Sequence, residues 1–155
     1  MANESKTSEI ARRKPIAGGH LRKGEREAVA PSKPGTVSIK AVRQGLPVKV
    51  FKTLAVDLEM GERQLAAVLK IPNRTLDRRL KEGVLSPEES DRVARVARIL
   101  GRANEVFGNA EKARGWMNTR LAAFDSETPL ERADTSLGAT QVEDVLGRID
   151  YGVYT

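Results

Sequence analysis

The chain has 155 residues, with 27 Lys and Arg against 21 Asp and Glu, a formal net charge of +6, one His and no Cys. Without Cys there can be no disulfide, thiolate metal site or cysteine nucleophile, and His20 alone cannot supply the relays of histidine-based catalysis. We therefore expect no enzyme, no metal site and no cofactor. No run approaches the roughly 18 apolar residues of a membrane span, and the first residues lack the apolar stretch of a signal peptide. These features predict a cytoplasmic protein.

The basic excess is confined to the first half of the chain. Residues 1–35 hold eight basic and four acidic side chains, residues 36–85 ten and five, and residues 86–155 nine and twelve. A basic front and an acidic back indicate two different partners, one of them polyanionic. Residues 1–35 have no sustained apolar period, so we expect a disordered or partly helical basic tail there.

From residue 36 onward apolar residues return at helical spacing, and few of them are aromatic, which is typical of an all-α fold. Four helices are predicted in this part: 37–46 and 48–60, broken at Gly45 and Pro47, then Gln64 to Leu69, and Asn73 to Lys81 before Gly83. The last two have the spacing of a helix-turn-helix. Its buried positions would be Leu65, Ala66, Leu69, Ile71, Leu76 and Leu80.

The opposite face of the second of these helices would enter the major groove of operator DNA. It carries Asn73, Arg74, Asp77, Arg78 and Lys81. Asn73, Arg74 and Arg78 suit base edges, because Arg pairs with guanine and Asn with adenine. Arg79 and Lys81 are better placed for phosphates, whereas Asp77 would accept from cytosine or orient Arg74 or Arg78.

Start signals for a long helix follow at Ser86-Pro87-Glu88-Glu89, and Gly108 ends it. Its polar face is expected to be solvated and carries Arg92, Arg95, Arg98 and Arg102. Further helices are predicted over 110–117, with Trp116 as a core anchor, and from Thr128-Pro129. A Leu137-Gly138 turn should precede a last helix over 140–151.

Six ordered motifs occur in this half: LSPEESDR (85–92), EVFG (105–108), AxxW (113–116), TPL (128–130), DTSLGA (134–139) and VEDVLGRIDYGVY (142–154). With the preceding helix-turn-helix they resemble the Xre-MbcA-ParS antitoxins, whose second half is a toxin-binding domain. The run 117–121 departs from the family pattern. After the basic tail (1–35) expected from composition, the resemblance implies an Xre-like helix-turn-helix domain (36–85) and a small helical toxin-binding domain with a C-terminal helix and tail (86–155).

The resemblance further implies a type II antitoxin that neutralises a RES-domain toxin, an enzyme that degrades NAD+, and represses the operon of both. In the family the antitoxin C-terminus reaches toward the toxin active site. Here the corresponding toxin-binding residues are Gly147, Arg148, Ile149, Tyr151, Gly152, Val153, Tyr154 and Thr155. Gly152 would let the chain leave the helix axis, Tyr151 and Tyr154 would be anchors, and the acidic second half suits a basic cleft.

A homodimer is expected, because paired helix-turn-helix units read half-sites one turn of DNA apart. Apolar residues in 48–60 or in 93–107 could supply the interface. The alternative is a stand-alone helix-turn-helix regulator whose second half binds an effector or partner, although one Trp and two Tyr offer little for a pocket. An enzyme is least favoured, because its best carboxylate cluster, Glu88, Glu89 and Asp91, suits the first turn of a helix.

Overall fold

The computed structural model describes residues 37–152, where the all-α prediction is confirmed. This part of the chain has two isolated β-bridges but no strand. The elements are α1 (Ile39–Gln44), α2 (Val48–Asp57), α3 (Glu62–Val68), α4 (Asn73–Glu82), α5 (Pro87–Phe107), α6 (Ala110–Met117), the 3-10 turn η1 (Ala122–Phe124), α7 (Pro129–Arg132) and α8 (Ser136–Asp150). The predicted basic tail lies outside the described residues. None of these helices is long and apolar enough to cross a membrane.

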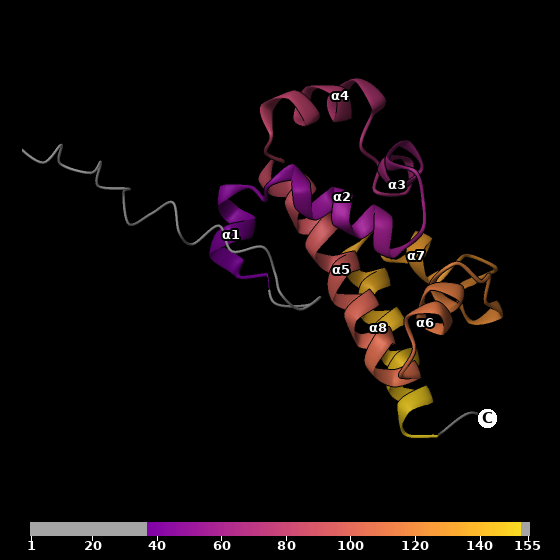
Figure 1. Ribbon diagram of the computed structural model, residues 1–155. Coiled ribbons are helices and arrows are strands. Elements are labelled where there is room, and N and C mark those ends of the chain that lie inside the picture. Colours follow the sequence, from indigo (N-terminus) through magenta and orange to yellow (C-terminus); the bar gives the residue numbers. More distant parts are fainter. Residues whose placement is uncertain (1–36, 153–155) are drawn as a thin grey trace, which may run out of the picture.

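The long helix α5 is the axis of the molecule (Figure 1). It begins as predicted, with Pro87 in its first turn and a capping box between Ser86 and Glu89, and ends at Gly108 in a left-handed conformation. Its apolar stripe, including Val93, Val96 and Ile99, is fully buried, and α8, α6, α1 and α2 pack around it. One hydrophobic core therefore extends through both halves of the chain.

The polar face of α5 is not the solvated stripe that the sequence predicts. Arg95 donates to the carbonyl oxygen of Asp134 (2.9 Å), Arg98 to Glu143 (2.8 Å) and Arg102 to Asp150 (2.6 Å). Arg92 donates instead to the carbonyl oxygen of Leu69, in the helix-turn-helix, at 3.2 Å. These arginines tie α5 to the helix-turn-helix on one side and to α8 and the segment before it on the other. The local sequence could not indicate this, because the partners lie 23 to 48 residues away.

The predicted Leu137-Gly138 turn is wrong, because both residues are in the first turn of α8. Thr135 is the N-cap, and its hydroxyl accepts a hydrogen bond from the Gly138 N–H at 3.0 Å. Gly138 is required here for closeness, since a Cβ on it would lie 1.8 Å from the carbonyl oxygen of Arg132. Gly138 thus lets α8 pack directly on the end of α7.

Trp116 packs against the hydrophobic core as expected, although its side chain is only half-buried. Its ring contacts that of Phe107 in a tilted arrangement, with a centroid distance of 5.8 Å and an interplanar angle of 46°, while the neighbouring Met117 is fully buried. The connection between α6 and α8 is held by a second capping box, formed by Thr128 and Glu131. The predicted helix start at Thr128-Pro129 is confirmed, although the helix is a single turn.

A backbone clasp holds the end of α4 against the start of α2. The Leu85 N–H donates to the Leu46 carbonyl oxygen at 2.8 Å, and the Val48 N–H donates to that of Gly83 at 3.0 Å. Gly45 has a φ of 92°, and a Cβ on it would lie 2.3 Å from the Leu85 carbonyl oxygen. These hydrogen bonds hold the two ends of the segment from α2 to α4 together, directly before the start of α5.

Candidate functional site

Helices α3 and α4 form the predicted helix-turn-helix. Its apolar positions Leu65, Ala66, Leu69, Ile71 and Leu76 are buried, and Leu80 is half-buried against the core. The turn is closed by the Ile71 N–H, which donates to the Ala66 carbonyl oxygen at 2.8 Å. Lys70 has a φ of 56° in this turn, a conformation that Gly adopts more readily. The hydrophobic pattern thus fixes which face of α4 is left exposed.

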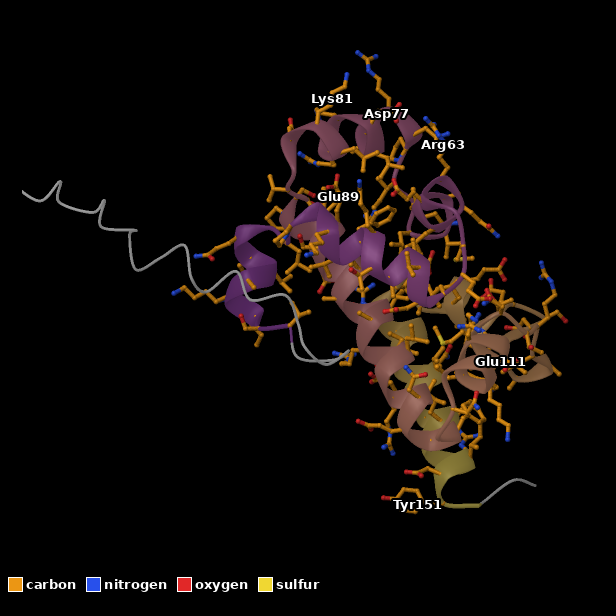
Figure 2. The ribbon with its side chains drawn as sticks, viewed as in Figure 1. Arg63, Asp77, Lys81, Glu89, Glu111 and Tyr151 are labelled. Atoms are coloured by element: carbon orange, nitrogen blue, oxygen red, sulfur yellow. The ribbon has the colours of Figure 1, made fainter. Side chains whose placement is uncertain are left out.

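That exposed face lies at one end of the molecule (Figure 2). It carries the predicted DNA-contacting residues Asn73, Arg74, Asp77, Arg78 and Lys81, all of which are exposed. Arg78 lies 3.8 Å from Glu82, one turn along the helix, an exposed pairing that solvent screens. The face is therefore accessible and predominantly basic.

Arg79, the remaining predicted DNA contact, points in another direction. Its Nε atom lies 2.7 Å from a carboxylate oxygen of Glu89, its Nη1 atom lies 2.8 Å from Glu82, and its side chain is only 17% exposed. Because these carboxylates occupy its guanidinium, we assign Arg79 to anchoring α4 on α5 rather than to binding phosphate. The sequence alone could not place Arg79 and Glu89 together, since they belong to different helices.

Glu89 is the acceptor at the centre of this anchor. Burial raises the pKa of Glu89, but hydrogen bonds from the Arg79 guanidinium and the Ser86 backbone N–H outweigh it, so the pKa lies below its ordinary value. A lowered folded-state pKa means that the ionised carboxylate stabilises the fold at neutral pH. This contribution is lost as the pH falls from about 5 through the folded-state pKa.

We expect Glu89→Gln to lower the free energy of unfolding at neutral pH by about 1.5–3 kcal/mol, the range for a hydrogen bond to a charged group. The deficit should be smaller at about pH 3.5, below the ordinary pKa of a glutamate, because the unfolded parent chain then binds a proton at Glu89 that the folded chain, with its lowered pKa, binds less readily. Urea unfolding at the two pH values measures it. Glu88→Gln, at an exposed neighbouring position, is the matched control and should change little. An equal deficit at both pH values would contradict the assignment.

Sequence reasoning overlooked Arg63, which lies on α3 and pairs with Asp77 on α4. Its Nη2 atom is 3.2 Å from the Asp77 Oδ1 atom. The sequence suggested Arg74 or Arg78 as the residue that Asp77 might orient. The sequence indicates only that a basic residue lies two positions before the buried Leu65. Basic residues beside buried ones are common on helices, so this does not identify a partner.

The other candidate site lies at the end of α8, far from α4 (Figure 1). Ile149 is half-buried against the core and Arg148 is exposed. Tyr151 is 82% exposed, and Gly152 has a φ of 67°, in the left-handed region, so the α-helix ends there. Val153, Tyr154 and Thr155 lie outside the described residues.

The acidic character of α8 is smaller than its composition suggests. Glu143 and Asp150 are paired with Arg98 and Arg102 of α5, so two of its carboxylates are neutralised within the chain. Electrostatic attraction to a basic cleft is therefore a weaker argument than the sequence predicts. The exposed Tyr151 and the left-handed conformation of Gly152 are the stronger features of this end.

A hollow of about 560 Å³ lies between the turn of the helix-turn-helix and the start of α5. Its lining is rich in charged side chains, among them Lys70, Arg78, Glu88 and Arg92, and contains no aromatic residue. Pockets for small ligands are usually apolar with a few convergent polar groups. This hollow does not favour an effector site.

A compact helix-turn-helix joined through one long helix to a second helical unit defines a two-part DNA-binding protein, and comparisons with known proteins specify its kind. Residues 38–98 match the antitoxin Xre-like helix-turn-helix domain, and residues 102–152 match the antitoxin Xre/MbcA/ParS C-terminal toxin-binding domain. The chain belongs to the Xre/MbcA/ParS antitoxins, a non-enzymatic family. It is thus an antitoxin whose two domains bind DNA and a toxin.

Among its relatives is an Antitoxin Xre of Yersinia enterocolitica, 32% identical over 132 residues, which cover 84% of this chain and 89% of the relative. An Antitoxin Xre of Photorhabdus laumondii is 30% identical over 79% of this chain and 84% of its own length. An Antitoxin Xre of Pseudomonas putida is 41% identical over 53% of this chain and 52% of its own length. The two family matches meet within α5, which spans both domains.

Proposed function

We propose that this antitoxin neutralises a RES-domain toxin by inserting its C-terminal segment into the toxin active site, where the toxin degrades NAD+, and that it represses the operon of both proteins. The observation that supports the first part is the end of α8, where Tyr151 is 82% exposed and the left-handed conformation of Gly152 stops the helix. An exposed aromatic side chain with a polar tip is a typical interface anchor. The predicted contacts on either side of it are Arg148, Ile149, Val153, Tyr154 and Thr155.

The repressor function is supported by the exposed, predominantly basic face of α4. Asn73, Arg74 and Arg78 are proposed to read base edges and Lys81 to contact a phosphate. The DNA-facing α4 and the end of α8 lie at opposite ends of the molecule (Figure 1). A toxin at one end would therefore leave the other end open to DNA, so the two functions are compatible in one complex.

Arg74→Ala and Arg78→Ala should each weaken binding to the promoter DNA of the operon by about 1–3 kcal/mol and relax base preference. Both side chains are exposed, so neither change should unfold the protein. Titration of a labelled promoter duplex, with a scrambled duplex for comparison, measures the loss. Parent-like affinity in both variants would reject this face as the DNA-binding surface.

We also propose that the antitoxin binds its operator as a homodimer. Of the two candidate interfaces, α5 has its apolar stripe buried within the chain, whereas Val56 of α2 is 73% exposed. Burial of this stripe argues against α5 as the dimer interface, whereas the single exposed valine on α2 does not by itself define one, because isolated apolar side chains are common on protein surfaces. It leaves α5 to connect the two domains of each protomer.

A further inference from the structure

The DNA-facing side of α4 contains one carboxylate, Asp77, among basic residues. Arg74 and Lys81 lie three residues before it and four residues after it, so all three share one face of the helix. A carboxylate that faces DNA phosphates weakens binding unless a cation pairs with it. The residue that pairs with Asp77 therefore matters for how this face meets DNA.

That residue is Arg63, in the first turn of α3. Its Nη2 atom lies 3.2 Å from the Asp77 Oδ1 atom, and the two side chains are 65% and 50% exposed. An ion pair this exposed contributes little to folding stability. A guanidinium has five N–H donors, so a single contact through Nη2 leaves capacity for a second acceptor. The pair is better explained as a means of orienting Arg63 than as a stabilising contact.

The position of the pair fits a contact with the DNA backbone. Arg63, Asp77 and Lys81 lie along one edge of the molecule at its α4 end (Figure 2). When the second helix of a helix-turn-helix enters the major groove, the first helix crosses the backbone beside it. From this position, Arg63 would extend the basic face of α4 to the phosphates at the groove edge.

We propose that Arg63 binds a backbone phosphate and that Asp77 is a positioning residue that holds its guanidinium, rather than a reader of cytosine. This inference rests on the proposed use of α4 in DNA binding. It adds a contact from α3 and gives the one acid on the face a defined role. Its consequence is that Asp77 helps binding only when Arg63 is present.

The test is a double-mutant cycle on the full chain, with labelled promoter and scrambled duplexes titrated at several salt concentrations. Arg63→Ala should weaken binding to both duplexes by about three- to tenfold and reduce the salt slope by about one for each protomer bound. Asp77→Asn should weaken binding in the parent but strengthen it in the Arg63→Ala background, where Asp77 is an unpaired repelling charge. This change of sign is a readout that a purely structural role would not produce.

Arg120→Ala is the matched control, because Arg120 is 68% exposed and lies 3.9 Å from its carboxylate partner Glu131, in the toxin-binding domain. It removes the same charge and should leave the salt slope nearly unchanged. Parent-like affinity and slope in Arg63→Ala, an equal gain from Asp77→Asn in both backgrounds, or a change of base preference from Asp77→Asn alone would each overturn the inference. If only Arg74→Ala and Arg78→Ala weaken binding, the inference fails and the proposed DNA surface stands.

Discussion

Removal of residues 151–155 should abolish neutralisation of the toxin while leaving DNA binding intact. These residues follow the last turn of α8, and the side chain of Tyr151 is 82% exposed. The deletion therefore removes none of the described core residues. Growth of cells that co-express the proposed RES-domain toxin measures neutralisation, and titration of promoter DNA measures the other function. Full rescue of growth by the truncated chain would refute insertion of this segment into the toxin.

A point substitution refines this prediction. Tyr151→Ala should reduce toxin affinity by about 2 kcal/mol or more, as expected for an aromatic hot spot, with an unchanged unfolding temperature. Leu137→Ala is the matched control, because Leu137 is 73% exposed at the opposite end of the same helix. Equal effects of the two substitutions on toxin affinity would mean that Tyr151 has no special role. Calorimetric titration of the purified toxin with each variant would decide this.

The helix-turn-helix could be predicted because its signals are local. Positions Leu65, Leu69 and Leu76 repeat at helical spacing, and their burial determines which side chains of α4 face outward. The same holds for α5, whose capping box and terminal Gly108 are sequence signals with a direct physical cause. Local patterns thus correctly gave the all-α fold and the exposed face of α4.

What could not be predicted depends on residues that are distant in sequence. Arg79 was expected at phosphates, but it is held by Glu89 of the next helix. Arg63 gave no signal, because its partner Asp77 lies 14 residues further on. In both cases charge and helical position are known from the sequence, whereas the identity of the partner requires the tertiary structure.

The prediction of a turn at Gly138 failed for a different reason, because this glycine is required by close packing and not by a turn. Glycine after a polar segment usually marks a turn, yet here it is a helical residue that a neighbouring backbone contacts. A Cβ at this position would lie 1.8 Å from the Arg132 carbonyl oxygen, whose atoms belong to the backbone and cannot move independently. Gly138→Ala should therefore lower the free energy of unfolding by about 3 kcal/mol, as expected for severe overpacking.

Gly147→Ala is the control within the same helix. A Cβ on Gly147 would have no heavy atom within 4 Å, so this substitution should stabilise α8 by about 0.5–1 kcal/mol through helix propensity alone. Denaturant unfolding should therefore give changes in the free energy of unfolding of opposite sign for the two substitutions. That result would show that glycine is required at position 138 because α7 lies close to it, and not because of the helical backbone. If both substitutions stabilised the protein, the start of α8 would have to lie further from the Arg132 carbonyl oxygen than the structure shows. The position of the α8 start next to Asp134, whose carbonyl oxygen accepts from Arg95, would then also be in question.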